Sequence, residues 1–334
     1  PPSPGRMGNA PFALGSLDTR FELRSAAVSK AGAAPAPGPE VNARSFGFVG
    51  DDPSAAVGFQ VFFTPDTSTR INAGNAWRVA EAAIEALWLP PQAGGFALDR
   101  FLDVIEGEPA AAFCEGGGTY AVTPAPTANP APGSTFAASF ANCTTAGPDP
   151  VTFQGTLTLR VDESTGPLSS AGNYAIAFTL DPIAVTTTDA VGPNTLSGAT
   201  RFQRTASAGA HAETSRSVSG KTLTTSESEF SAVLGPYDLS SGRTAAGAYS
   251  FGASGQSARV DRSDIGVLNV QVRTPLAGAG ETPPTQGEVR VVAEDGSRLT
   301  VAVGPGGVTL AADADGDGTA EDTLGPVPWD PVFD

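Results

Sequence analysis

Five acidic side chains lie within ten residues near the C-terminal end of the chain, in the stretch DADGDGTAED (313–322). Asp313, Asp315 and Asp317 occupy alternate positions, and Gly318 follows them. Calcium is a hard cation that takes six to eight oxygen ligands, and alternating acidic side chains with a sharp glycine turn supply them from one short loop. The stretch therefore predicts a structural calcium site.

Further ligands are expected from the remainder of this loop, namely the main-chain carbonyl of Thr319 and the carboxylate of Glu321 or Asp322. An EF-hand is not predicted, because Leu324 stands where that motif requires a glutamate. The spacing resembles calcium loops set in β-hairpins, as in integrin-type and thrombospondin-type repeats, and the flanking segments GVTLAAD and DTLGPV have strand patterns. A solvated Asp-Gly turn is the alternative interpretation.

The chain contains two cysteines, Cys114 and Cys143, which are predicted to form a disulfide within a β-hairpin. Pairing them in one antiparallel register places Tyr120 opposite Ala137 and ends the ladder at the Pro-rich loop 124–133. Two buried free thiols are the alternative. Redox catalysis is not predicted, because the sequence contains no C-x-x-C motif.

Signatures of catalysis are sparse. The single histidine, His211, is the only candidate base for a Ser-His-Asp triad, and no G-x-S-x-G motif accompanies it. No H-E-x-x-H, phosphate-binding loop or dinucleotide fingerprint occurs. The sequence therefore predicts a protein that is not an enzyme. A glycoside hydrolase ranks third among the hypotheses, because 35 acidic residues are available and the chemistry needs only two.

The elements that would position these residues are mostly strands. From about residue 111 onward, short segments rich in Thr, Val, Phe and Tyr alternate with Gly, Pro, Ser, Asn and Asp turns. This pattern predicts a mainly β fold, an antiparallel meander, sandwich or open barrel, with a small two-helix insert. Three regions are expected: an N-terminal extension and Pro/Ala linker (1–45), strands with the helical insert (46–110), and a large β domain (111–334).

The helical insert has a clear apolar stripe that contains Trp77 and Trp88. Asn75 is expected to cap the first helix and Pro90 to end it. A second helix is expected over 97–107. Core packing is the favoured role for the two tryptophans, and an aromatic platform for a glycan is the alternative.

Composition limits which partners the protein could bind and in which cellular compartment it could lie. The formal net charge of −16 would repel a nucleic-acid backbone, so nucleic acid is excluded as a partner. The sequence contains no run of about 18 apolar residues, so no membrane helix is predicted. The chain opens on PPSPGRMG, and together with the cysteine pair this is interpreted as an exported mature form, extracellular, on the cell surface or periplasmic. A strand pattern at 15–28 suggests self-association by strand addition.

The cysteine segments CEGGGTY and SFANCT, the strand FQGTLTLRV and the C-terminal acidic loop resemble a group of bacterial secreted or lipid-anchored envelope proteins of uncharacterised activity. The resemblance covers about residues 70–334 and implies an envelope location but no activity. The favoured hypothesis is a non-enzymatic envelope or cell-surface protein with a structural, adhesive or assembly role. The alternative is a glycan- or lipid-binding β module.

Overall fold

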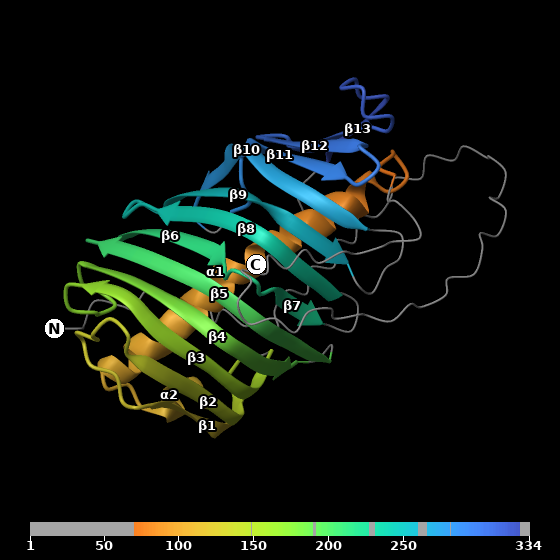
Figure 1. Cartoon of the computed structure of the whole chain (residues 1–334). Helices are drawn as coiled ribbons and strands as arrows, with labels where there is room; N and C mark the ends of the chain where they lie inside the picture. The colour runs from red at the N-terminus through yellow and green to blue at the C-terminus, as the bar shows by residue number, and fades with distance from the viewer. Residues whose placement is uncertain are drawn as a thin grey trace, which may run out of the picture.

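The computed structural model describes residues 70–327, apart from 148, 190–191, 227–230, 260–265 and 281 (Figure 1). The predicted N-terminal extension (1–45), the strand-addition segment 15–28 and the part of the second predicted region before residue 70 lie outside the described residues. The division of the chain into three regions therefore stays a prediction.

The described strands form one antiparallel sheet of 14 strands, which follow each other in chain order except that β7 pairs with both β5 and β8. The mainly β antiparallel meander is confirmed. Pairing continues without a break from β1 to β14, so among the described residues the strands form one sheet and not the two sheets of a sandwich. The strands are β1 (Gly117–Thr123), β2 (Thr135–Thr144), β3 (Thr152–Thr165), β4 (Tyr174–Thr188), β5 (Pro193–Ser207), β6 (Ala210–Ser217), β7 (Leu223–Ser226), β8 (Ser231–Arg243), β9 (Ala248–Arg259), β10 (Val267–Ala279), β11 (Gln286–Ala293), β12 (Arg298–Gly304), β13 (Gly307–Asp313) and β14 (Asp322–Val327).

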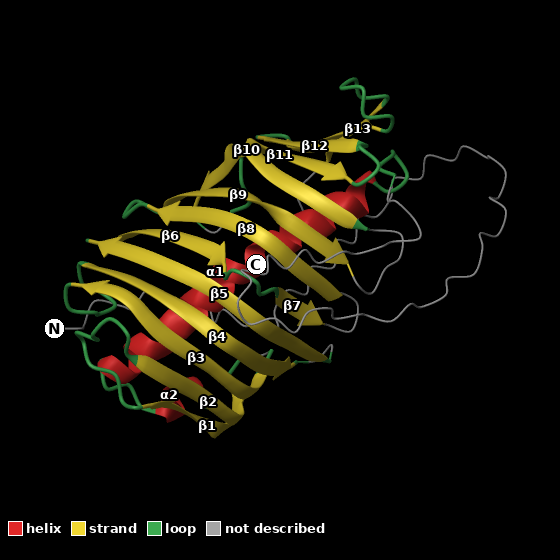
Figure 2. Ribbon diagram, viewed as in Figure 1, coloured by secondary structure: helices red, strands yellow, loops and turns green. Residues whose placement is uncertain are grey.

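A single long helix, α1 (Ala76–Ile105), crosses the strands on one face of the sheet, and a short helix, α2 (Ala110–Phe113), follows it (Figure 2). The helix contacts β5, β6, β8, β9 and β11 to β13. Its N-terminal end lies near β12 and β13, and its C-terminal end lies near β1 and β2 (Figure 1). One helix thus connects the two ends of the sheet.

The expectation that Pro90 ends the first helix is wrong, because α1 continues through Pro90 and Pro91 to Ile105. An interior proline removes a helix hydrogen bond and costs about 3 kcal/mol. Apolar side chains are buried on both sides of the break, among them Leu87 before it and Leu98 after it. Their burial against one continuous sheet outweighs the local cost, so the two expected helices merge into one.

Close approach of the helix to the sheet depends on Gly94. A Cβ atom at this position would lie 2.8 Å from the Cβ of Phe202 on β5, closer than two such atoms approach. Of the α1 side chains that the structure describes, only Arg78 is exposed. The inner face of the sheet and the helix together form one apolar core.

The predicted disulfide is present, but the predicted strand register is wrong. Cys114 and Cys143 are bonded, with their Cα atoms 4.9 Å apart. Tyr120 pairs with Phe140 and not with Ala137. The shift arises because Cys114 caps α2 before β1 begins, and because β2 is irregular near Asn142, which has a φ of 50°. The bond therefore joins α2 to β2.

Candidate metal centre and a buried ion network

The acidic stretch forms the loop of the β13–β14 hairpin, and both flanking strands have the bounds that the sequence predicts. The structure brings together four of the predicted ligands, Asp313, Asp315, Asp317 and Glu321. One carboxylate oxygen from each lies within 4.8 Å of the others. Asp313 is buried, and the other three side chains are exposed to solvent. This arrangement is open to solvent on one side and anchored in the sheet on the other.

Main-chain N–H groups fix the orientation of all four carboxylates. The N–H of Gly318 donates to Oδ2 of Asp313 at 2.9 Å, and that of Ala314 donates to Oε2 of Glu321 at 2.6 Å. Asp315 and Asp317 each accept a hydrogen bond from the N–H two residues later in the chain. Each carboxylate has two oxygens with about four lone-pair sites in all, so these bonds leave acceptor capacity for a cation.

Asp313 gives the strongest indication of a ligand. The residue is 6% exposed, and its Oδ1 atom is buried without a hydrogen-bond partner among the described residues. Its other oxygen, Oδ2, accepts the Gly318 hydrogen bond and lies 3.5 Å from Nη1 of Arg298. A buried carboxylate oxygen without a partner is costly, and a bound cation would remove that cost.

Two further ligands were predicted, Asp322 and the main-chain carbonyl of Thr319, and the latter stays a prediction. Asp322 is not part of the cluster, because it begins β14 and pairs with Ala312 of β13. The N–H of Thr319 donates to Oδ1 of Asp317 at 2.7 Å. The sequence analysis missed the role of Gly316. A side chain there would lie 2.5 Å from the carbonyl oxygen of Gly296, so this glycine lets the acidic loop approach the β11–β12 turn.

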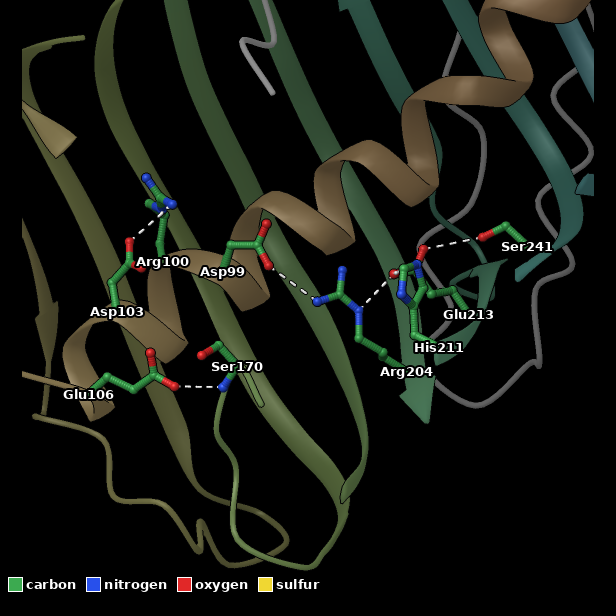
Figure 3. A network of polar contacts seen from close by, with 9 residues as sticks. All are labelled: Asp99, Arg100, Asp103, Glu106, Ser170, Arg204, His211, Glu213 and Ser241. Atoms are coloured by element: carbon green, nitrogen blue, oxygen red, sulfur yellow. Dashed lines mark hydrogen bonds and ion pairs between the residues drawn. The ribbon is translucent and has the colours of Figure 1, made fainter. Parts of the chain in front are cut away.

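A second polar cluster lies on the inner face of the sheet beneath α1 (Figure 3). Nε of Arg204 on β5 donates to Glu213 on β6 at 2.7 Å, and its Nη1 donates to Asp99 on α1 at 3.2 Å. Ser241 on β8 donates to the other oxygen of Glu213 at 3.2 Å. Burial disfavours the charge on Arg204, but Glu213 and Asp99 outweigh this effect and raise its pKa. The network ties the helix to three strands.

His211 lies beside this network, with its Nε2 atom 3.8 Å from Glu213. Burial lowers the pKa of His211. The negative charge of Glu213 raises this pKa, whereas the positive charges of Arg204 and Arg243 lower it further. Ser241 is hydrogen-bonded to the carboxylate of Glu213, whereas a serine nucleophile in a triad is bonded to the histidine. The sequence analysis missed the Arg204 network, although the alternation of β5 places Arg204 on the same face as buried Phe202.

The two tryptophans on α1 are half-buried against the apolar core. The ring of Trp88 stands edge-on to Phe251, with 4.4 Å between centroids. A hollow beside α1, lined by Leu89, Thr187 and Asn194 among others, has a volume of about 10 Å³, enough for about one water molecule. Because both tryptophans pack against the apolar core, core packing is favoured over a glycan-binding platform as their role.

Comparison with known proteins gives no relative: no family model matches the chain, and no curated protein or solved structure is significantly similar to it. The resemblance to bacterial envelope proteins therefore stays a prediction. Neither helix of the described part combines the length and the apolar character that crossing a membrane requires.

Proposed function

We propose that this chain is a non-enzymatic, exported structural protein that holds one calcium ion in its β13–β14 loop. The observation that supports the proposal most strongly is the clustering of four carboxylates, one oxygen of each within 4.8 Å of the others, in a group that includes the buried Asp313. Oδ1 of Asp313 has no hydrogen-bond partner among the described residues. A divalent cation at this point would satisfy that oxygen and offset the mutual repulsion of the four acids.

Calcium suits this loop better than magnesium does. Calcium accepts six to eight oxygens in flexible geometry, whereas magnesium demands near-ideal octahedral coordination and usually keeps several waters. The four carboxylates come from positions 313, 315, 317 and 321 of one hairpin loop. Calcium sites of extracellular modules bind at about 0.1–1 mM. A site of this strength stabilises a fold and does not drive chemistry.

Export is supported by the Cys114–Cys143 bond, because disulfides persist in oxidising compartments. A structural role is supported by the way α1 lies against the inner face of the sheet and connects its two ends. The outer face is left for contact with a partner in the envelope.

A glycan-binding role is the second candidate, and the outer face of the sheet favours it. The cross-strand row Ser139, Thr156, Ala184, Ser197 and Thr224 runs over five strands, from β2 to β7. Neighbouring strands lie about 4.8 Å apart, so the row presents small, mostly hydroxyl-bearing groups at a regular spacing that could hydrogen-bond to a polysaccharide. Sedimentation with insoluble polysaccharides, comparing the wild type with Thr156→Lys, separates this candidate from the first.

Calorimetric titration with calcium tests the proposed function. The expected result is one site with a dissociation constant of about 0.1–1 mM, abolished in Asp315→Asn and retained in Asp322→Asn. Asp322 is a matched control, since it belongs to the same hairpin but lies outside the cluster. Absence of binding at 10 mM calcium would leave only the solvated-turn interpretation.

A further inference from the structure

The chain that leads into α1 is attached to the acidic loop. We name residues 70–75 the lead-in turn. Nε of Arg70 donates to the carbonyl oxygen of Ala314 at 3.1 Å, and Ala314 lies between two of the cluster carboxylates. The N–H of Ile71 donates to Oγ of Ser297 in the β11–β12 turn at 2.8 Å, and this bond is buried. These contacts join segments more than 220 residues apart in the chain.

The lead-in turn is itself rigidly organised. Asn75 is at the N-cap position, as expected, but its side chain does not cap the helix. Instead its Oδ1 accepts the N–H of Asn72 at 2.9 Å, and its Nδ2 donates to the carbonyl of Arg70 at 2.9 Å. The main-chain N–H of Ala76, the first residue of α1, donates to the carbonyl of Asn72. Displacement of Arg70 and Ile71 would therefore be passed directly to the start of the helix.

The two loops that hold the lead-in turn also hold each other. Gly316 of the acidic loop lies close against the carbonyl of Gly296 in the β11–β12 turn. Arg298, the first residue of β12, lies 3.5 Å from Asp313. Oγ of Ser297 donates to Asp295 at 2.6 Å while it accepts the bond from Ile71, so its orientation is fixed. The acidic loop, the β11–β12 turn and the lead-in turn thus form one contact cluster.

We propose that calcium in the acidic loop acts as a latch that holds the lead-in turn, and with it the N-terminal end of α1, against the sheet. This inference rests on the proposed calcium site. Without the ion, four carboxylates within 4.8 Å repel each other and the loop opens. The acceptor for Arg70 and the support for the β11–β12 turn are then lost together. The coupling is reciprocal: the factor by which calcium favours docking of the lead-in turn is also the factor by which docking raises the affinity of the loop for calcium.

One effect acts against the latch. The ion lowers the negative charge of the loop, and this weakens the attraction between the loop and the guanidinium of Arg70. That contact is exposed, so solvent and salt screen the charge. The bond from Ile71 to Ser297 is buried and joins neutral groups, so the charge change does not weaken it. The amide of Ile71 is therefore the direct reporter of the latch.

Hydrogen–deuterium exchange of the full chain tests the latch. Exchange in peptides that cover 71–80 is measured at 0, 1 and 10 mM calcium, at constant ionic strength. For a dissociation constant of about 0.1 mM, opening should become about 11-fold rarer at 1 mM and about 100-fold rarer at 10 mM. Peptides from β3 and β4, at the far end of α1, serve as the reference and should not change.

Three variants separate the latch from the metal site. Asp315→Asn should lose both calcium binding and the protection of 71–80, and Asp322→Asn should keep both. Ser297→Ala should still bind calcium in calorimetry but lose the calcium-dependent protection of Ile71. Calcium binding without any change of exchange in 71–80, or full protection in Ser297→Ala, would overturn the latch while the calcium site stands. Failure of the wild type to bind calcium would overturn both proposals.

Discussion

The two ends of α1 are attached to the sheet by different kinds of interaction. At the C-terminal end, Phe96 stacks on Phe153 of β3 at 5.2 Å, and Arg100 lies 4.0 Å from the ring of Phe113 in α2. The disulfide holds α2 to β2, and the buried Arg204 network holds Asp99. At the N-terminal end, Ile71, Ala76 and Val79 are buried in the apolar core. The polar attachments there are the hydrogen bonds of Arg70 and Ile71 to two loops, one of them acidic.

We propose that this difference gives the helix one permanent end and one end whose attachment depends on calcium. Aromatic packing, a covalent bond and buried ion pairs at the C-terminal end require nothing from the solvent. Part of the attachment at the N-terminal end involves a loop with four clustered carboxylates, and we propose that a cation offsets their mutual repulsion.

The largest effect is expected from Arg204→Ala at the C-terminal end. The change leaves Glu213, whose side chain is 11% exposed, without its ion-pair partner, and this costs about 3–5 kcal/mol of unfolding free energy. Asp99, whose side chain is 33% exposed, also loses its partner, at a smaller cost because solvent screens it. Urea denaturation measures the loss. Arg160→Ala is the matched control on the outer face, because its side chain is 60% exposed, and it should cost less than about 1 kcal/mol. Equal losses in the two variants would contradict the account of the buried network.

Removal of the disulfide is expected to have the next largest effect. Cys114 and Cys143 are 29 residues apart in the chain, so the chain-entropy model gives about 3–4 kcal/mol for the bond. The double variant Cys114→Ala/Cys143→Ala should show this loss, and exchange should rise first in α2 and β1. An equal rise in the lead-in turn would mean that the two ends of α1 are not held independently.

Alkaline pH should weaken the fold at two buried tyrosines, one of them at the C-terminal end of α1. Burial raises the pKa of Tyr120 on β1 to about 12, and the same cause raises that of Tyr237 on β8 to about 12. The unfolded chain ionises these groups near pH 10, so it loses protons before the folded state does. Stability is then fully present below pH 10 and falls between pH 10 and 12, by about 3 kcal/mol per tyrosine. Tyr120→Phe should show a shallower decline in a pH series of thermal unfolding, and an unchanged slope would refute the assignment.

Strand periodicity was the most informative part of the sequence. It predicted the antiparallel sheet and the bounds of the β13–β14 hairpin, because alternation of side chains along a strand is a local property. The path of α1 through Pro90 was not predictable from local rules, since burial of residues on both sides decides it. The predicted register of the disulfide hairpin was wrong because β2 is irregular near Asn142, and the alternation of residues along the strand does not indicate this.

The candidate site was partly predictable. Residue types and spacing identified the acidic loop, but only the fold shows that Asp313 is buried and that Asp322 belongs to the strand. The Arg204 network joins residues from α1, β5, β6 and β8, and the pairing between these elements is not contained in any single segment of sequence.

The smallest effect concerns the N-terminal end of α1, and it tests the central claim most directly. Thermal unfolding of the wild type and of Asp315→Asn should be compared in 1 mM calcium and in chelator. The wild type should gain about 1.4 kcal/mol from calcium for a dissociation constant of about 0.1 mM, and the variant should gain nothing. An equal response of the two proteins, or no response in the wild type at 10 mM calcium, would contradict a metal centre at the β13–β14 loop.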